Sequence, residues 1–388
     1  MIQDFLASQH LLNPSALPIK VWVLAPHIES EDDNIDYYYD FSQSIAEYTK
    51  VFNELQVHWH WQPVTMNNFR SIIDQIESEK DSNSFFPIVL NLCDGDEING
   101  TPGISVVRLL EEKDLVYTGA DEHFYAITTS KIPMKKAFDD KHVANAAWMI
   151  VNADTIADDS LFERLGYPVI VKPAVSGGSM GVGIRNVVEN KAELENLLDS
   201  LNKGYRGWNL NGDGMIAEQF INGREFTTFI IGSADRPEQV MVYKPVERVF
   251  HPSLPDKEKF LSFDRLWEIY EEESAMPGED NFYEYQLPEA ALIEPIKQLS
   301  WDAFCATGGK GYTRVDLRMD NATGKLYVLE VNAQCGISED ENFTSIGAIL
   351  RLSGNSFTAA VGHIIEDAIR RAAAKKTTLQ KTSNPVRA

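Results

Sequence analysis

The chain has 388 residues and a mass of 43.7 kDa, which allows two or three compact units at roughly 100–200 residues per domain. Hydrophobic residues make up 44% and charged residues 24%, a composition that excludes a disordered or fibrous chain. Lys and Arg number 35 against 58 Asp and Glu, a formal net charge of −23. Such a surface repels phosphate backbones and anionic headgroups, so we expect no nucleic acid and no membrane among the partners.

Targeting and redox signals are weak. The three cysteines, Cys93, Cys305 and Cys335, are far apart and lack CxxC spacing, so neither a disulfide framework nor a zinc site is indicated. No histidine lies near Cys335 in the sequence, which favours a small loop residue over a nucleophile. The first residues lack a basic stretch followed by an apolar one, and no apolar run approaches the ~18 residues of a membrane span. We therefore expect a soluble, cytoplasmic protein.

Strand and helix signals alternate over the first third of the chain. We expect strands at 19–25, 57–64, 86–92 and 115–118, and helices at 41–55, 67–79 and 104–113. This alternation predicts an α/β domain whose parallel sheet carries helices on both faces. Because ligands of such sheets bind at the carboxyl ends of the strands, the polar, Gly-rich loop after Leu92 is a candidate rim of a site.

From about Thr129 the pattern changes to an α+β arrangement. We expect helices at 129–138, 191–201, 289–306, 344–352 and 356–374, strands at 166–173, 181–187, 215–220, 225–231 and 240–245, and a hairpin of 312–320 and 325–332. We divide the chain into an N-terminal α/β domain (1–128), a central subdomain (129–214), a C-terminal subdomain (215–375) and a flexible tail (376–388).

The hairpin predicts a polar site on one face of a sheet. A turn centred near Ala322 would place Arg314 opposite Glu330 and Asp316 opposite Val328. Because side chains alternate with period two, Arg314, Asp316, Glu330 and Asn332 share one face, and apolar residues occupy the other. Two carboxylates and an amide suit Mg²⁺, which prefers a few carboxylates together with substrate phosphates. The alternative is a solvated face with cross-strand ion pairs such as Arg314–Glu330.

Two further segments indicate nucleotide binding. Lys172 ends the apolar run VIVKP, and a Gly-rich loop with Ser179 follows, an arrangement in which backbone N–H groups and one lysine handle phosphates. In the segment AEQFINGREFT, a strand ends at Glu218 and a second begins near Glu225. Its backbone would read an adenine edge, and its carboxylates suit ribose hydroxyls. The alternatives are a mobile turn beside a surface lysine and a bare Asn-Gly hairpin with exposed glutamates.

The order VIVKP–GGSMG, AEQFINGREFT and YTRVDLRMD…LYVLEVNAQCG resembles the ATP-grasp superfamily and is most similar to D-alanine–D-alanine ligase. The similarity covers roughly residues 86–372 and, less clearly, 19–60. It implies an ATP-grasp fold with an N-terminal parallel-sheet domain, in which 129–214 forms the lid and 215–375 carries the metal and substrate site.

The resemblance also implies the cofactors and the role of each site residue. The cofactors would be ATP and two Mg²⁺ ions, for which Mn²⁺ could substitute, held by Asp316, Glu330 and Asn332. The nucleotide residues would be Lys131, Lys172 and Lys259 at the phosphates, Ser179 in the closing loop, Glu218 at the adenine amino group, the backbone around Gln219, Phe220 and Ile221 at the hinge, and Glu225 at the ribose. Arg314 and the Gly336 backbone would stabilise an oxyanion.

The reaction implied joins a small-molecule carboxylate, such as an amino acid, to an amine. The carboxylate attacks the γ-phosphate to form an acyl phosphate, which the amine then attacks, giving a dipeptide or amide, ADP and phosphate. The family also implies a homodimer. Alternatives are a D-alanine–D-alanine ligase proper, an ATP-grasp kinase or carboxylase, and a non-catalytic nucleotide sensor.

Departures from the family pattern concern the substrates. Phe260 replaces a tyrosine, Gly178-Ser179 replaces a serine pair, and Glu31 is the nearest match to the glutamate that orients the first substrate. The position that receives the second substrate's carboxylate falls on or beside Glu341, within an acidic stretch. D-alanine as both substrates is therefore not expected, and an unpaired Glu341 would favour a cationic amine. The alternative is that these acids are only solvated.

Overall fold

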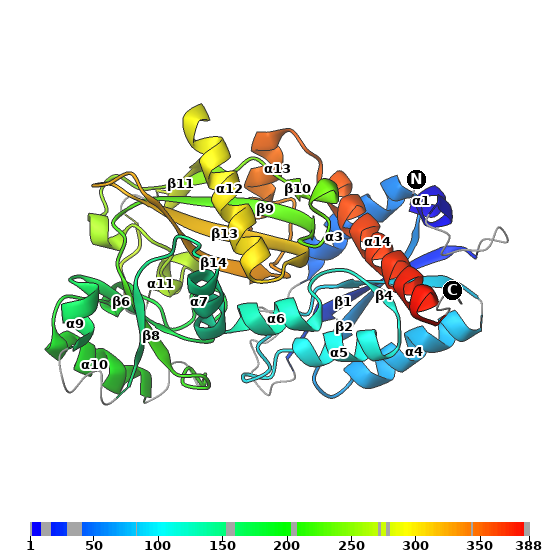
Figure 1. Ribbon diagram of the computed structural model, residues 1–388, viewed down its shortest axis with the longest axis horizontal. Helices are drawn as coiled ribbons and strands as arrows, with labels where there is room; N and C mark the ends of the chain where they lie inside the picture. Colours follow the sequence, from blue (N-terminus) through cyan, green and yellow to red (C-terminus); the bar gives the residue numbers. More distant parts are fainter. Residues whose placement is uncertain are drawn as a thin grey trace, which may run out of the picture.

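The computed structural model describes residues 2–8, 17–28, 41–82, 84–152, 160–202, 208–270, 273–276, 280–342 and 344–383. Three sheets follow one another along the chain, and helices cover their faces (Figure 1). No helix within these ranges is long and apolar enough to cross a membrane.

The first sheet has the order β2-β1-β3-β4, and all of its strand pairs are parallel. Its strands are β1 (Ile19–Pro26), β2 (His58–Val64), β3 (Phe86–Asn91) and β4 (Val116–Tyr117). The helices of this part are α1 (Ile2–Ser8), α3 (Ser42–Leu55), α4 (Phe69–Asp81), α5 (Ile104–Glu112) and α6 (Glu122–Thr129). Residues 21–24 are all buried, because helices cover both faces as a parallel sheet requires. The predicted parallel sheet is confirmed.

The central part is a four-stranded antiparallel sheet of order β5-β8-β6-β7. Its elements are α7 (Lys131–Asp140), β5 (Trp148–Val151), α9 (Ser160–Leu165), β6 (Val169–Pro173), β7 (Val187–Val188), α10 (Lys191–Asn202) and β8 (Met215–Gln219). Because β8 pairs with β5 and β6, the sheets divide between Gln219 and Gly223, and not at residue 214.

The strand predicted at 181–187 is wrong for most of its length. Ile184–Asn186 form a 3₁₀ turn, and β7 has only two residues. The buried Asn186 amide donates to the carbonyls of Val171 and Gly181, both at 2.8 Å. These side-chain bonds compete with a strand ladder and hold the turn against β6.

The C-terminal sheet is antiparallel, with the order β12-β11-β9-β13-β14 and with β10 on β9. Its strands are β9 (Gly223–Ser233), β10 (Met241–Val242), β11 (Val246–Phe250), β12 (Tyr283–Gln286), β13 (Lys310–Asp320) and β14 (Leu326–Ala333). The helices here are α11 (Phe263–Leu266), α12 (Ala290–Ala306), α13 (Ser345–Ser353) and α14 (Phe357–Ser383). In Figure 1, α12 crosses one face of this sheet, and α14 runs between it and the first sheet.

Two buried clusters tie the N-terminal and C-terminal parts together. One contains Phe304 of α12 and Val315 of β13, and it continues to helices α4 and α5. The other contains Ile365 of α14, Phe229 of β9 and Val23 of β1. The last helix therefore covers two sheets at once, which buries apolar faces that neither sheet would bury alone.

Helix α14 is longer than predicted. It continues to Ser383, so residues 376–383 of the predicted tail are helical. The Thr377 and Thr378 hydroxyls each donate to the carbonyl four residues earlier, at 3.0 Å. Lys, Leu and Gln in this segment are good helix formers, and this intrinsic preference continues the helix.

The hairpin register also differs from the prediction. Arg314 lies opposite Asn332, and Asp316 lies opposite Glu330. A bulge after Asp316 leaves Leu329 without a partner, because Leu317 pairs with Val328. The bulge turns Val328 into the apolar core, where Leu329 was expected. The four polar residues nevertheless share one face, since the register error is an even number of residues.

Candidate active site

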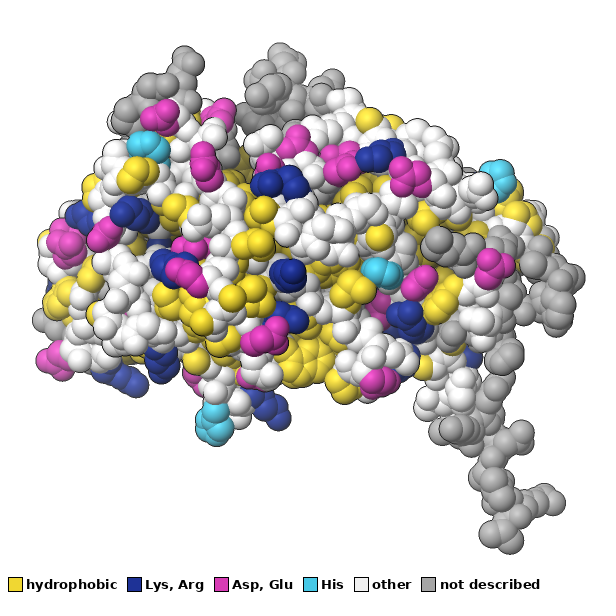
Figure 2. All heavy atoms as spheres, turned by 90° about the horizontal axis from the view of Figure 1, so that it is seen from above, with side chains coloured by type: hydrophobic (Ala, Val, Ile, Leu, Met, Phe, Trp, Pro, Cys, Tyr) yellow, Lys and Arg dark blue, Asp and Glu magenta, His cyan; other side chains and the backbone are white. Residues whose placement is uncertain are grey.

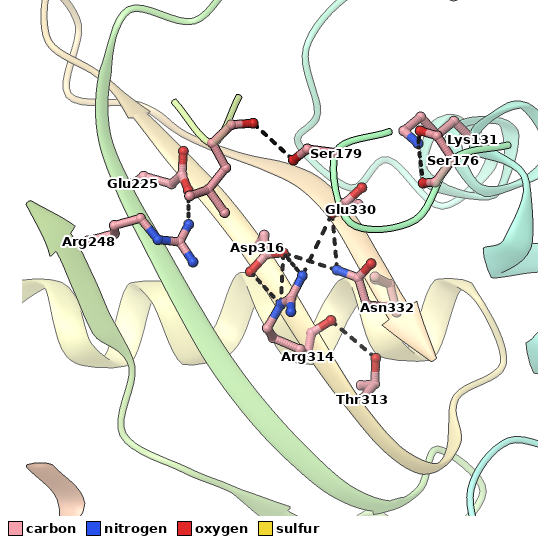
Figure 3. Close-up of polar contacts among 12 residues, drawn as sticks. Lys131, Ser176, Ser179, Glu225, Arg248, Thr313, Arg314, Asp316, Glu330 and Asn332 are labelled. Carbon is pink, nitrogen blue, oxygen red and sulfur yellow. Dashed lines mark hydrogen bonds and ion pairs between the residues drawn. The ribbon is translucent and has the colours of Figure 1, made fainter. Parts of the chain in front are cut away.

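The polar face of the hairpin forms one compact cluster (Figure 3). Arg314 donates to Asp316 from Nε and Nη2, at 2.8–3.1 Å. Asn332 Nδ2 donates to Asp316 Oδ2 at 3.0 Å and to Glu330 Oε1 at 3.2 Å. Burial alone would raise the pKa of Asp316, but Arg314 and Arg248 outweigh it and lower the pKa. Asp316 is therefore ionised at neutral pH.

The donor set fits a magnesium site of the kind that shares its ion with phosphates. No group of three or more His, Cys, Asp or Glu able to hold a metal is found among the described residues. Two carboxylates and an amide oxygen would suffice for Mg²⁺, because Mg²⁺ usually keeps waters and takes its other ligands from a nucleotide.

A second cluster lies between α7, β6 and β8. Glu218 is almost fully buried, and its Oε2 lies 3.3 Å from Lys135 Nζ and 3.5 Å from Lys172 Nζ. Lys131 Nζ donates to the Ser176 hydroxyl at 3.0 Å and to the Ser176 carbonyl at 3.3 Å. The negative charge of Glu330 in the hairpin raises the pKa of Lys131, against the larger lowering by burial. The two clusters therefore lie near each other. The predicted residues Lys131, Lys172 and Glu218 thus come together.

Lys135 was not predicted. It follows Lys131 by four residues on α7, the spacing that places two side chains on one face of a helix. That spacing was the available signal in the sequence.

The Gly-rich loop is held by the segment that follows β11. Ser179 Oγ donates to the Leu261 carbonyl at 2.9 Å, and Trp267 Nε1 donates to the Gly178 carbonyl at 2.9 Å. The Phe263 N–H donates to the Val182 carbonyl at 2.8 Å. Glu273 then accepts from the Ile184 N–H, also at 2.8 Å. The long acidic and aromatic segment therefore positions this loop.

Glu225 lies in a row of charged residues across the sheet. It pairs in register with Arg248 of β11 and with Arg318 of β13. The Arg248 guanidinium forms an ion pair with Glu225 and also donates to the Tyr285 hydroxyl at 3.0 Å. Figure 3 shows this pair beside the Asp316 cluster. The sequence analysis missed Arg248, because the cross-strand partner of Glu225 depends on a register that the chain does not reveal.

The residues expected at the hinge lie at the end of β8 and directly after it. Gln219 is exposed, whereas Phe220 and Ile221 are buried. The Phe220 N–H donates to the Pro168 carbonyl at 3.1 Å. Phe260 is buried against Phe220, with ring centroids 6.1 Å apart, in an apolar cluster with Ile170. It thus serves packing beside the hinge.

The Lys259 side chain pairs with an acid three residues earlier in the chain. Its Nζ donates to Asp256 at 2.8 Å, and its side chain is 30% exposed. Its carbonyl accepts a hydrogen bond from Arg318. The structure therefore anchors the Lys259 backbone to β13 but pairs the side chain with an exposed acid.

The loop after β14 connects the hairpin to the first sheet. Gln334 Nε2 donates to the Cys93 carbonyl at 2.8 Å, and the Ala120 N–H donates to Gln334 Oε1 at 3.3 Å. Cys335 is buried, which raises its pKa to about 12 and argues against a thiolate nucleophile. Gly336 follows Cys335 and is two residues beyond Gln334, close in the chain to the end of the hairpin.

Asp94 occupies the predicted rim after β3 and was not singled out from the sequence. The Tyr125 hydroxyl donates to the carbonyls on both sides of it, those of Cys93 and Gly95, at 3.3 and 2.7 Å. Although the Asp94 side chain is exposed, desolvation by the surrounding protein raises its pKa to about 6. A carboxylate of raised pKa at the carboxyl end of a parallel strand is typical of a functional site.

Two acids in the stretch after Gly336 have cationic partners. Arg351 donates to Glu341 Oε2 at 2.6 and 3.1 Å, and Lys50 donates to Glu339 at 2.8 and 3.0 Å. Glu341 is therefore not an unpaired acid in this structure. Glu31, the other substrate residue expected, lies outside the described residues.

Helix α13 begins directly after this stretch, with Thr344 as its N-cap. The Thr344 and Ser345 hydroxyls are buried and have no hydrogen-bond partner among the described residues. The N-terminus of a helix carries a partial positive charge and free N–H groups. Together with two unpartnered hydroxyls, it is suited to a carboxylate.

Charge elsewhere is mixed. Figure 2 shows Lys and Arg side chains interspersed with Asp and Glu over the face seen from above. On this face, charges of both signs alternate, and no broad field of one sign is formed.

The fold and the two clusters define the class of the protein. A smaller and a larger antiparallel sheet frame a site lined by lysines and carboxylates, which is the arrangement of an ATP-grasp protein. Residues 138–366 match the family model described as D-ala D-ala ligase C-terminus. That match spans more than half of the chain, and the chain belongs to this family.

Curated relatives agree with this assignment. A D-alanine–D-alanine ligase of Xanthomonas axonopodis pv. citri is 28% identical over 286 residues, which is 73% of this chain and 79% of the relative. A D-alanine–D-alanine ligase of Acetivibrio thermocellus is 26% identical over 343 residues, or 86% of this chain and 78% of the relative.

Solved structures show the same fold. The D-alanine–D-alanine ligase of Bacillus anthracis complexed with ATP matches with a TM-score of 0.62 and 19% identity, over 93% of this chain and 100% of that one. The D-Ala:D-Ser ligase of Enterococcus faecalis matches with a TM-score of 0.61 and 15% identity, over 91% and 100%. The predicted ATP-grasp fold is confirmed.

Proposed function

We propose that the chain is an ATP-dependent ligase that joins an amino acid, through its carboxylate, to the amine of a second amino acid. The observation that carries this proposal is the meeting of the Glu218 lysine cluster with the Asp316–Glu330–Asn332 face. One cluster supplies cations for a triphosphate, and the other supplies oxygen ligands for its counter-ion. The nucleotide would lie between the central and C-terminal sheets.

ATP would be held by residues from α7, β6, β8 and β9 and from the loops that follow β6 and β8. Lys131 and Lys172 would contact the phosphates, and the loop with Ser179 would cover them. Glu218 would accept from the adenine amino group. Since the Phe220 N–H already binds the Pro168 carbonyl, Ile221 would supply the hinge N–H. Glu225 would bind the ribose while Arg248 keeps it oriented.

Asp316, Glu330 and Asn332 would hold Mg²⁺, which when bound neutralises charge on the phosphates. Arg314 already clamps Asp316 through two nitrogens, which orients the carboxylate. We place Arg314 also beside the reacting carbonyl, where its remaining donors would stabilise a developing oxyanion together with the Gly336 backbone. Lys259 would reach the γ-phosphate only after leaving Asp256.

The order of steps follows from the leaving groups. The carboxylate oxygen of the donor attacks the γ-phosphorus, and ADP leaves. The amine nitrogen of the acceptor then attacks the acyl carbon, the C–O bond to phosphate breaks, and phosphate leaves as the amine proton is lost. Because phosphate is a good leaving group, no protein nucleophile is required, in agreement with the raised pKa of Cys335.

The acceptor would carry a carboxylate. The α13 N-terminus with Thr344 and Ser345 suits that group, and Glu341, which would repel it, is neutralised by Arg351. This replaces the cationic amine expected from the sequence. The relatives named above act on D-alanine or D-serine, so small amino acids are the first acceptors to test.

A pairwise screen of amino acids as donors and acceptors, with ADP and phosphate release as readouts, tests the proposal. Release that requires both partners, together with a new amide in the mass spectrum, supports a ligase. Release that requires the donor alone indicates a kinase. Binding of ATP with no release under any pair indicates a sensor. We further propose a homodimer that works in the cytoplasm, and light scattering tests the dimer.

A further inference from the structure

Lys135 is the most deeply buried of the lysines around Glu218. Its side chain is fully buried, whereas that of Lys172 is 15% exposed. Because a phosphate contact requires an accessible ammonium, Lys172 is better placed than Lys135 to touch the triphosphate. Its Nζ lies 3.3 Å from Glu218 Oε2 and has no aligned hydrogen-bond acceptor among the described residues. The side-chain contact of Lys135 within the described residues is therefore with Glu218.

Glu218 uses only one of its oxygens within the protein. Lys135 and Lys172 both approach Oε2, while Oε1 is buried and has no partner among the described residues. A buried carboxylate oxygen without a donor is costly, and such an atom indicates a missing ligand. The ligand group must donate a hydrogen bond in an enclosed place.

The charged groups around Glu218 come from three elements. Helix α7 supplies Lys131 and Lys135, strand β6 supplies Lys172, and Glu330 of β14 acts on both α7 lysines. Burial would raise the pKa of Glu218, but these lysines outweigh it and lower the pKa. Burial in turn lowers the pKa of Lys135. The pair is thus held charged by mutual attraction in a dry environment.

We propose that Lys135 is a positioning residue that fixes the Glu218 carboxylate so that Oε1 accepts a hydrogen bond from the exocyclic amine of adenine, and that it thereby sets the preference for a 6-amino over a 6-oxo purine nucleotide. The proposal rests on the proposed ATP site. A 6-oxo purine presents an acceptor to Oε1, and two facing acceptors repel. A site built around a buried acceptor rejects such an analogue by about 100-fold or more.

Loss of Lys135 would change the chemistry of Glu218. With one cation fewer, the buried carboxyl would hold its proton to higher pH. The protonated form has an O–H that donates to a 6-oxo group and does not accept from an amine. The Lys135→Met variant should therefore bind ATP weakly at pH 6 and recover as the pH rises, and its preference for ATP over ITP should fall to about tenfold or less.

The test is calorimetric binding of ATP and of ITP, each with Mg²⁺, between pH 6 and 9. Lys136→Met is the matched control, because Lys136 is the exposed neighbour on the same helix. Wild type and this control should show the same ATP/ITP ratio and nearly the same pH profile. If Lys135 only fills space, Lys135→Met lowers the melting temperature but leaves the ratio and the profile at wild-type values, and the proposal is overturned.

A second variant covers the case in which Lys135→Met does not fold. Lys135→Met/Glu218→Gln removes both charges and leaves no buried ion. It should fold, bind ATP with no pH dependence beyond that of wild type, and lose most of the ATP/ITP preference. Full retention of the preference in this variant also overturns the proposal. Failure of the wild type to bind ATP would instead reject the proposed function.

Discussion

Replacement of Glu330 by Gln tests the metal-binding role of the hairpin with little structural disturbance. The side chain is 32% exposed, and its ion pair with Arg314 is long, at 4.0 Å. The glutamine oxygen can still accept from Asn332, which now donates at 3.2 Å. Loss of one such exposed pair should change the free energy of unfolding by less than about 1 kcal/mol.

The effect of Glu330→Gln on turnover should be much larger. A neutral amide neutralises less positive charge and binds Mg²⁺ more weakly than a carboxylate, so stabilisation of the transferring phosphoryl group is lost. By comparison with the removal of one transition-state contact, kcat should fall about 10²–10³-fold, or about 2.7–4 kcal/mol. ATP should still bind, since Lys131, Lys172 and the hinge are untouched.

The assay is ADP formation with a working donor and acceptor pair, alongside thermal melting and ATP calorimetry. Glu284→Gln on β12 is the matched control, since Glu284 is exposed on a strand and the charge change is the same. The control should retain wild-type kcat. ADP formation by Glu330→Gln within about tenfold of wild type would refute the metal assignment.

Three further predictions concern the loop, the rim and the acceptor. Amide exchange in residues 174–183 should slow when ATP and Mg²⁺ bind. Trp267→Ala, which removes the hydrogen bond to the Gly178 carbonyl, should speed this exchange in the absence of ATP, whereas the control Tyr270→Ala should not. Equal protection of these amides in all states would count against the role of the loop. Because the folded protein raises the pKa of Asp94 to about 6, the folded state binds the proton more tightly, and the ionised carboxylate destabilises the fold above that pH. Asp94→Asn should therefore raise Tm at pH 8 and hardly at pH 4. An equal shift of Tm at both pH values would contradict this reasoning. Ser345→Ala should raise KM for the carboxylate-bearing acceptor about tenfold and leave KM for the donor unchanged, since a hydrogen bond to a charged group contributes about 1.5–3 kcal/mol. A change in both KM values would contradict the assignment of Ser345 to the acceptor carboxylate.

The shared face of Arg314, Asp316, Glu330 and Asn332 was predictable from the sequence, although the register was wrong. Strand side chains alternate with period two, so an even-numbered slip preserves every face. The bulge at Leu329 was not predictable, because it depends on how β13 is held by β9 on its other edge. That packing decides which of Val328 and Leu329 enters the core.

The sequence by itself determined the parallel first sheet, the hairpin face and the order of the phosphate, hinge and metal segments, because periodicity and short motifs are local properties of the chain. Only the tertiary structure decided the partners of the charged groups. Glu341 meets Arg351, Glu339 meets Lys50, and Glu218 meets Lys135. These ion pairs join different elements, and their formation depends on packing that brings distant segments together. An acid that looks free in the sequence can therefore be ion-paired in the fold, and the Glu341–Arg351 pair is the reason why we propose an acceptor with a carboxylate in place of a cationic one.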